Sequence, residues 1–190
     1  NYGQHNAIIC GFQFCSGDFV VTMDEDLQQD PYDIQLLIDK QNAEDSDVVY
    51  GFYKKLEYSV FRNITSKLVK SILSKALPEL HQDYSAFRLL RIDIANESTK
   101  MRNSYTFLDG YITWLTQNIS STVVSHKERI AGESSYNIKK LTIHLLNIIF
   151  TFSKLPVKLL TYSSMCMILL STIYSVYLIF RKMVFDDIIP

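Results

Sequence analysis

Two aspartates with one residue between them offer the clearest chemistry in this sequence. Asp24 and Asp26 follow the apolar run Phe19–Met23. In an extended segment, residues i and i+2 face the same way, so both carboxylates can point into one cleft while Glu25 points away. Two carboxylates on one side can share a hard cation. A solvated acidic turn is the alternative, and the pair alone does not exclude it.

The apolar run before these aspartates predicts a short strand over residues 19–23. Because β-branched apolar residues dominate it, we expect a strand of a buried parallel sheet. Sheets of this kind bind ligands beyond the carboxyl ends of their strands, and Asp24 and Asp26 fall at that edge. The position therefore favours a metal site at the end of a strand.

Apolar spacing in the first 136 residues predicts strands that alternate with helices, which is typical of the α/β class. The Asp30-Pro31 pair predicts a helix start, because aspartate is a good cap and proline is favoured at the first helical position. The other expected elements, in chain order, are a helix at 4–15, strands at 19–23 and 47–53, a helix at 56–77, a strand at 85–92, a helix at 107–117 and a strand at 121–125.

The C-terminal part has a different composition. Leu159–Phe180 carries no formal charge and is long enough to cross a hydrocarbon core of about 30 Å, although its serines and threonines leave a buried hairpin of core helices as the alternative. Residues 138–152 mix lysines with apolar residues, which predicts a helix at a membrane interface. We therefore expect a catalytic domain at 1–136, juxtamembrane amphipathic helices at 137–158, and a transmembrane helix with its tail at 159–190.

Composition excludes several classes of protein. The formal net charge of −1 provides no overall basic field, so we expect no nucleic-acid partner. The three cysteines, Cys10, Cys15 and Cys166, lack zinc or disulfide spacing, and free thiols are predicted. The start at Asn1 has neither Met nor the features of a signal peptide, so we expect the chain to begin inside a longer protein.

Four motifs in a fixed order resemble the inverting family-two glycosyltransferases, especially the branch that includes dolichyl-phosphate mannose synthase and bacterial polyprenyl-phosphate glycosyltransferases. The resemblance implies a partial GT-A (Rossmann-like) nucleotide-sugar-binding domain, truncated at both ends. The motifs are Asn1-x-Gly3 continuing to Asp24-Glu25-Asp26-Leu27-Gln28, then Asp83-Tyr84-Ser85-Ala86-Phe87-Arg88, then Asp109-Gly110 with Trp114, and finally Arg129-x-x-Gly132-x-Ser134-x-Tyr136.

The resemblance also assigns roles to individual residues. It implies that Asp24 and Asp26 hold Mg²⁺ or Mn²⁺ against the diphosphate of a nucleotide-sugar donor, since these ions favour carboxylate oxygens and keep positions for phosphate. It places Asp83 beside the acceptor as a base or an orienting group. Arg88 is expected to support this segment through an ion pair. The residues assigned to binding of donor or acceptor phosphate are Gln28, Arg129, Ser134 and Ser135.

The last motif departs from the family pattern. Related sequences usually carry Lys just before the position of Tyr136, where this chain has Ser135. The Arg129 guanidinium can still bind two phosphate oxygens, and Ser134 and Ser135 offer hydroxyl donors. The departure leaves acceptors other than polyprenyl phosphate open.

These observations predict a membrane-associated, metal-dependent inverting glycosyltransferase that acts on a polyprenyl-phosphate or lipid-linked acceptor. Lysines before the apolar segment predict a catalytic domain on the cytoplasmic side of the cell membrane. One alternative is a glycan-extending transferase of surface polysaccharide synthesis with a hydroxyl acceptor, for which Asp83 would be an essential base. Another is an inactive nucleotide-binding fragment. A phosphatase of the haloacid dehalogenase type fits less well, because it has Thr where this chain has Gln28. The resemblance is compatible with a homo-oligomer, and the sugar and nucleotide stay open.

Overall fold

A four-stranded mixed sheet organises the first part of the chain. The computed structural model describes residues 3–53, 71–125 and 138–185. The chain divides into two compact units, Asn1–Phe152 and Ser153–Pro190. The expected domain boundary near residue 136 falls outside the described residues and stays a prediction.

The strands lie in the order β1-β3-β2-β4, and the central strand β3 runs antiparallel to both neighbours. Among the described strands, β2 and β4 are the one neighbouring pair that is parallel, and β1 runs in their direction but is hydrogen-bonded to the oppositely directed β3. The expectation that the first strand belongs to a parallel sheet is therefore wrong. An apolar run in the sequence indicates that a strand is buried. It does not indicate whether the neighbouring strand is parallel or antiparallel, because a sheet covered by helices on both faces gives the same apolar pattern in both cases. The strands are β1 Phe19–Thr22, β2 Val48–Phe52, β3 Arg88–Arg91 and β4 Ile119–Val123.

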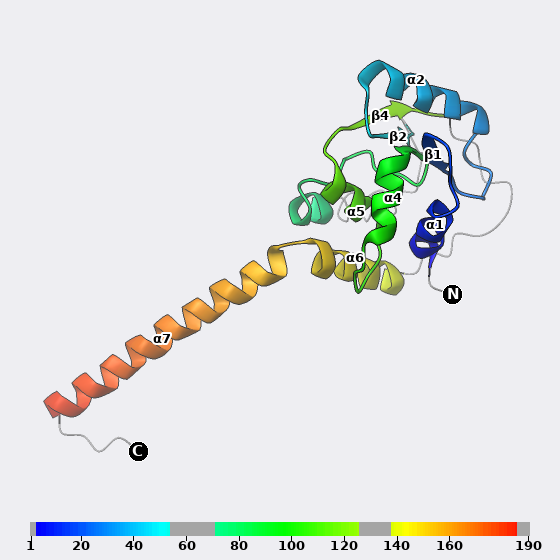
Figure 1. Cartoon of the computed structure of the whole chain (residues 1–190). Coiled ribbons are helices and arrows are strands. Elements are labelled where there is room, and N and C mark those ends of the chain that lie inside the picture. Colours follow the sequence, from blue (N-terminus) through cyan, green and yellow to red (C-terminus); the bar gives the residue numbers. More distant parts are fainter. Residues whose placement is uncertain (1–2, 54–70, 126–137, 186–190) are drawn as a thin grey trace. The chain divides into compact units, whose positions relative to one another are not determined.

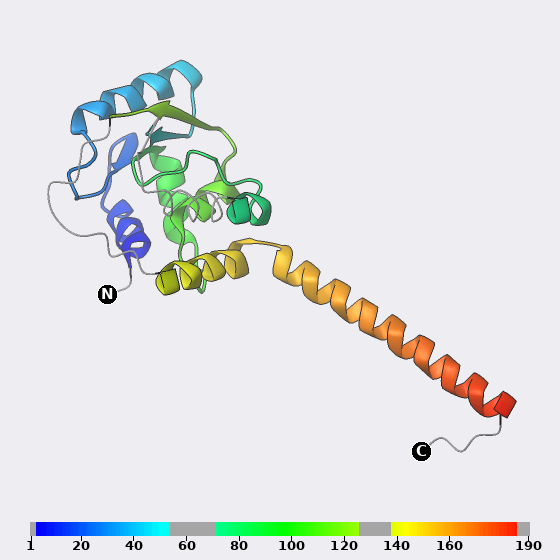
Figure 2. The same cartoon turned by 180° about the vertical axis from the view of Figure 1, so that it is seen from behind.

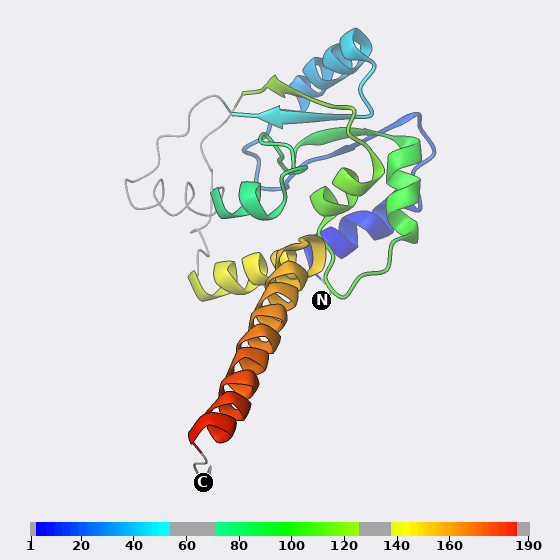
Figure 3. The same ribbon diagram turned by 90° about the vertical axis from the view of Figure 1, so that its left-hand side faces the viewer.

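Helices cover both faces of the sheet, as the three views agree (Figures 1, 2 and 3). Helix α2 (Ile34–Glu44) packs on one face, where its Leu37 meets Val49 and Leu89. Neighbouring strand residues point the opposite way, so Val48 and Leu90 lie in the core on the other face. That core also receives residues of three helices, α1 (Gln4–Phe12), α4 (Ile92–Lys100) and α5 (Leu108–Leu115).

The helix start predicted at Asp30-Pro31 is present. The Asp30 side chain accepts a hydrogen bond from the Tyr32 backbone N–H, and Pro31 opens a short 3-10 turn, Pro31–Asp33, that leads into α2. Helix α4 was not expected. It begins directly at the end of β3, and its polar sequence carries few apolar residues to mark a buried face. The stability of this helix comes from the packing of Ala95 and its neighbours in the core, because the local helix propensity is weak.

Helix α6 (Ile138–Phe152) completes the first unit and has the bounds expected for the amphipathic segment. Its buried residues Ile148 and Phe152 join a core with Phe107 and Tyr111. The Phe152 ring also lies 4.8 Å from the ring of Trp114, centroid to centroid. Aromatic packing therefore attaches this helix to α5.

The second unit is dominated by a single helix, α7 (Leu155–Phe185). Its segment Leu155–Val184 is long and apolar enough to cross a membrane, judged by length and composition, and none of its most apolar window is buried. The expected span, Leu159–Phe180, lies inside it. Core helices of soluble domains are mostly buried, whereas the apolar side chains of this window are exposed.

Candidate functional site at one edge of the sheet

Strand register brings two polar segments to one edge of the sheet. Arg88, the first residue of β3, lies opposite Thr22 at the end of β1 and opposite Tyr50 of β2. The turn that carries Asp24 and Asp26 therefore leaves the sheet beside the loop that enters β3 and carries Asp83. The Thr22 hydroxyl joins the two segments by donating a hydrogen bond to the Ala86 carbonyl, at 2.7 Å.

Asp24 and Asp26 lie in the turn after β1 and are half-buried, whereas Glu25 between them is exposed. This alternation is the one expected for an extended chain. The backbone N–H of Gln28 donates to Asp26 Oδ1 at 3.2 Å. Leu27 adopts a left-handed conformation with φ of 62°, which is costly for a residue with a bulky side chain. The turn is thus held in a specific shape against its local preference.

Two glutamine amides hold Asp24, and the sequence did not point to either. Gln29 is buried, accepts a hydrogen bond from the Asp24 backbone N–H at 2.7 Å and donates to Asp24 Oδ2 at 3.4 Å. Gln4 of α1 donates to Asp24 Oδ1 at 2.8 Å. The family resemblance points to the neighbouring Gln28 instead. A buried amide is recognised from its environment, and no spacing rule separates these adjacent glutamines.

Asp83 is half-buried and is held by one group from a distant strand and one from its own loop. The Ser121 hydroxyl of β4 donates to Asp83 Oδ2 at 2.8 Å, and the Asp83 backbone N–H donates to His81 Nδ1 at 3.2 Å. The His81 ring stacks on Tyr50, with centroids 5.7 Å apart. Ser121 is a further residue that sequence reasoning missed, because it lies 38 residues beyond its partner.

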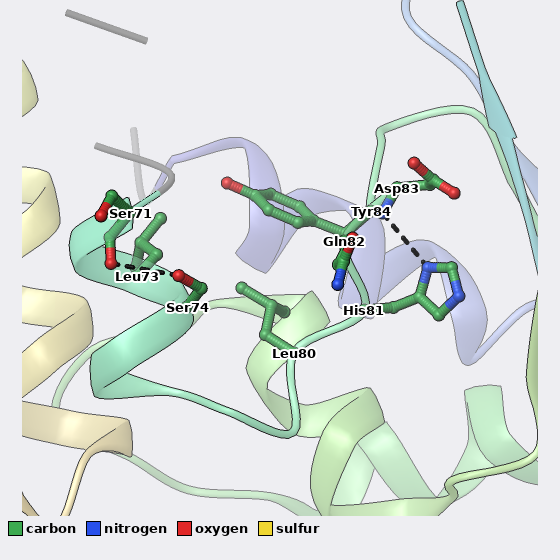
Figure 4. A pocket seen from close by; sticks show the side chains of 8 residues that line it. All are labelled: Ser71, Leu73, Ser74, Leu80, His81, Gln82, Asp83 and Tyr84. Atoms are coloured by element: carbon green, nitrogen blue, oxygen red, sulfur yellow. Dashed lines mark hydrogen bonds between the residues drawn. The ribbon is translucent and has the colours of Figure 1, made fainter. Parts of the chain in front are cut away.

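A cavity of about 460 Å³ opens beside Asp83 (Figure 4). The side chains of Leu80 and Tyr84 extend between the helical segment at residues 71–76 and the loop that carries His81 and Asp83. The cavity thus combines an acidic group with apolar walls. Its lining residues are Ser71, Leu73, Ser74, Leu80, His81, Gln82, Asp83 and Tyr84.

A buried ion pair lies next to these strand ends and connects them to helix α5. Arg88 donates through Nη1 to Asp109 of α5, and it donates through Nε to the Thr22 hydroxyl at 3.2 Å. The hydroxyl of Tyr50 donates to the same carboxylate at 2.8 Å. Burial, followed by the charge of Asp109, holds the pKa of Tyr50 well above its usual value, so the phenol stays a donor. The expectation that Arg88 acts through an ion pair is confirmed.

A second, polar cavity of about 620 Å³ lies in the same unit, between the start of α1, the loop at 103–106 and α6. His5 and His144 line it, and burial lowers the pKa of both. For His5 the charge of Asp109 opposes this effect, while Arg88 and His144 add to it. Both rings are therefore predominantly neutral near neutral pH.

Three of the predicted phosphate-binding residues cannot be placed. Arg129, Ser134 and Ser135 lie in the segment 126–137, outside the described residues. Gln28 is described, is half-buried and belongs to the turn that carries the two aspartates. The role assigned to each of these four residues stays a prediction.

The two aspartates fit a metal bound together with a substrate. Within residues 3–53, 71–125 and 138–185, no three His, Cys, Asp or Glu side chains gather as a metal site. Mg²⁺ and related ions, however, are commonly held by one or two carboxylates, with phosphates and waters completing the shell. The half-buried pair Asp24 and Asp26 offers this kind of incomplete ligand set.

The chain is similar to a known family of enzymes. Residues 1–105 match the model of "Glycosyl transferase family 2". The chain is 30% identical over 186 residues to undecaprenyl-phosphate 4-deoxy-4-formamido-L-arabinose transferase of Pseudomonas syringae pv. syringae, covering 97% of this chain and 55% of the relative. The protein of that name from Yersinia pestis is 29% identical, with 97% and 57% covered. The chain thus spans little more than half the length of these curated relatives.

Solved structures agree on the fold. Glucosyl-3-phosphoglycerate synthase from Mycobacterium tuberculosis, in complex with Mn²⁺, UDP-glucose and phosphoglyceric acid, matches with a TM-score of 0.56 at 16% identity, covering 78% of this chain and 53% of that one. The complex of that enzyme with Mg²⁺ and UDP also has a TM-score of 0.56. The expected GT-A type of α/β fold is confirmed, and this chain belongs to glycosyl transferase family 2.

Proposed function

We propose that this protein transfers a sugar from a nucleotide-sugar donor to a polyprenyl phosphate at a membrane surface, with inversion at the anomeric carbon. The observation that carries the proposal is the shared sheet edge. The Thr22–Arg88 register and the bond from Thr22 to Ala86 set the Asp24–Asp26 turn beside the loop of Asp83. A donor site and an acceptor site must adjoin in this way for a group to pass between them.

The donor is assigned to the side of the two aspartates. Asp24 and Asp26 would hold Mg²⁺ or Mn²⁺, which, when bound, neutralises charge on the departing nucleoside diphosphate. Support comes from a structural neighbour that was crystallised with Mn²⁺ and UDP-glucose, and with Mg²⁺ and UDP. The half-buried position of both carboxylates limits competition from water.

The acceptor is assigned to the cavity beside Asp83. The hydroxyls of Ser71 and Ser74 and the amide of Gln82 can donate hydrogen bonds to a phosphate head group. The apolar parts of Leu73, Leu80 and Tyr84 can contact the first units of a lipid chain. The relatives named above act, by their names, on undecaprenyl phosphate. In the reaction an acceptor oxygen forms a bond to the anomeric carbon, and the bond from that carbon to the diphosphate breaks with its electron pair. Asp83 then positions the attacking group, because a phosphate monoester is already anionic near pH 7.

The membrane would deliver this acceptor. Helix α7 is apolar over the length needed to cross a bilayer. Ile143, Leu146 and Phe150 recur along α6 at three- and four-residue spacing and are exposed, which suits a helix that lies in the interface. Cationic residues before α7 favour a cytoplasmic position for the first unit. A membrane-bound chain would meet an acceptor that is itself carried in the bilayer.

The test is a transfer assay with this chain in vesicles that contain undecaprenyl phosphate. A panel of nucleotide sugars is supplied with Mn²⁺, and the lipids are analysed by mass spectrometry. We expect one donor to yield a glycosyl polyprenyl phosphate, with an inverted anomeric configuration that NMR of the purified product identifies. Asp26→Asn should abolish the product, whereas Glu25→Gln, its exposed neighbour, should leave it unchanged.

Two results would contradict the proposal. One is the absence of product with every donor, together with no Mn²⁺-dependent binding of nucleoside diphosphates in calorimetry. The other is full transfer by Asp26→Asn. Product formed on a saccharide hydroxyl, with none on the lipid phosphate, would instead favour the glycan-extending alternative.

A further inference from the structure

We propose that Gln29 is a positioning residue that fixes Asp24 in the orientation needed to bind a divalent cation. The inference rests on the proposed function, because it takes Asp24 as a ligand of Mg²⁺ or Mn²⁺. It is supported by two hydrogen bonds between one buried amide and two parts of the same aspartate, one accepted and one donated by the amide.

The geometry of Gln29 is specific. Only 7% of the residue is exposed, its Oε1 accepts from the Asp24 backbone N–H at 2.7 Å, and its Nε2 donates to Asp24 Oδ2 at 3.4 Å. The amide oxygen only accepts and the amide nitrogen only donates, so the side chain cannot flip without losing both bonds. One group therefore restrains both the main chain and the carboxylate of Asp24.

Gln4 completes this restraint from another element. Its Nε2, on α1, donates to Asp24 Oδ1 at 2.8 Å. Each carboxylate oxygen has more than one lone pair, so an oxygen that accepts from an amide can still bind a cation. The two glutamines together define the direction of those remaining lone pairs. Hydrogen bonds of this outer kind orient metal ligands, and their loss typically lowers metal affinity 10- to 100-fold.

The orientation of Asp24 also depends on Gln29 because the turn between them is strained. Leu27, between Asp24 and Gln29, has a left-handed backbone. A turn in this conformation persists only where surrounding contacts impose it. The bonds from Gln29 to Asp24 close the turn on itself. Without them, Asp24 would have several side-chain orientations, and a cation would have to select one of them at a cost in free energy.

The test measures Mn²⁺ affinity of this chain directly, by electron paramagnetic resonance of free Mn²⁺, with Mn²⁺ added alone and then with uridine diphosphate. We compare Gln29→Met, which keeps the side-chain length without the amide, with Gln35→Met. Gln35 is the matched control, because its Nε2 also donates to a carboxylate, that of Asp39, but on the exposed face of α2. We expect Gln29→Met to weaken binding about 10- to 100-fold and Gln35→Met to leave it unchanged.

A double variant separates positioning from a general structural role. If Gln29 acts through Asp24, then Gln29→Met should cause no further loss of affinity in an Asp24→Asn background. Thermal unfolding checks that each variant is folded. Should Gln29→Met not fold, Gln29→Asn, whose shorter amide cannot span the same distance, is expected to show the loss.

The outcomes distinguish the inference from the proposed function. Unchanged Mn²⁺ affinity in Asp24→Asn, or no Mn²⁺ binding by the unaltered chain, would overturn the metal site and with it the role of Gln29. Weakened binding in Asp24→Asn with unchanged binding in the folded Gln29 variant would overturn the inference alone.

Discussion

Arg88 and Asp109 form an ion pair in the interior of the first unit, with 2% and 3% of their side chains exposed. The pair joins β3 to α5, and the Tyr50 hydroxyl shares the same carboxylate oxygen. Through Nε, Arg88 also reaches Thr22, two residues before Asp24. The buried ion pair is thus linked through Thr22 to the strand end that precedes the candidate metal site.

Removal of one member of this pair should destabilise the first unit strongly. Asp109→Leu would leave the Arg88 guanidinium buried without a counter-charge, and we expect a loss of about 3–5 kcal/mol in the free energy of unfolding. Urea denaturation followed by circular dichroism measures it. The double variant Arg88→Met/Asp109→Leu buries no lone charge and should recover most of the loss. A single variant as stable as the unaltered chain would contradict the importance of the pair.

Ser121 should matter to the reaction because it holds Asp83 at 2.8 Å. Ser121→Ala frees the carboxylate to rotate, and we expect kcat for transfer to fall roughly 10-fold, about 1.4 kcal/mol in the barrier. KM for the donor should change little, since the donor is assigned to the other side of the site. Ser121→Thr keeps the hydroxyl and should restore the rate. Equal rates in Ser121→Ala and the unaltered chain would show that this hydrogen bond has no role in transfer.

Asp83→Asn distinguishes between the two acceptor classes. A hydroxyl acceptor needs a base, so its transfer should fall 100-fold or more, within the range of general base catalysis. A phosphate acceptor is already anionic and should lose much less. Both rates are measured with one donor and the same protein preparation. Equal losses on the two acceptors would mean that Asp83 orients the substrate in both cases and does not serve as a base.

Acidification should destabilise the first unit through His5 and His144. Burial lowers the pKa of both side chains below the ordinary value of 6.5, so the unfolded chain binds protons more readily than the folded one. The contribution of the two neutral rings to the free energy of unfolding is complete above pH 6.5. It is lost as the pH falls toward the lowered pKa values of the folded state. Leu108 N–H donates to His5 Nδ1, a contact that requires this nitrogen to be unprotonated.

Urea denaturation at pH 7.5 and pH 5.5 measures this effect. We expect a lower free energy of unfolding at pH 5.5, and a smaller difference in His5→Asn and His144→Asn, which carry no titrating ring. The titratable groups near His5 include Asp109, Arg88 and His144. Because His5 and His144 interact, the effects of the two single variants on the free energy of unfolding need not add. Stability that rises on acidification, or a difference unchanged in both variants, would contradict the assignment.

Local signals in the sequence predicted the elements with strong local patterns. The cap at Asp30, the strand before Asp24 and the amphipathic helix α6 all follow from residues within a few positions. The antiparallel pairing of β1 did not follow, because its partner β3 lies about 70 residues later in the chain. Helix α4 was missed for a related reason: its polar sequence becomes helical where α1 and α5 pack on it.

In the candidate site, too, local features were predicted from the sequence and long-range contacts were not. The aspartates were predicted as site residues from their types and spacing, but their hydrogen-bond partners were not predicted. Gln4 lies 20 residues before Asp24, and Ser121 lies 38 residues after Asp83. A single sequence does not show which of many serines and glutamines will meet a given carboxylate. Tertiary structure decides those partners, and they are the groups that convert an acidic motif into an oriented site.

Gly110 should be required for the docking of α6. A Cβ at this position would lie 2.5 Å from Cδ1 of Phe152, closer than atoms of two side chains can approach. Gly110→Ala should therefore displace the Phe152 ring from its contact with Trp114 and destabilise the first unit by about 1–3 kcal/mol. Gly11 is the matched control, because it lies in α1 with open space at its Cβ position. There the substitution to Ala should stabilise the helix by up to about 1 kcal/mol.

Urea denaturation gives the free energies, and tryptophan fluorescence reports the Trp114 environment directly, since this is the sole tryptophan of the chain. Phe152→Leu shortens the opposing side chain, so it should cost less in a Gly110→Ala background than alone. That comparison identifies the steric contact as the cause. A Gly110→Ala chain with unchanged stability and fluorescence would show that α6 does not pack on α5 through Phe152, and the attachment of the amphipathic helix would then need another contact.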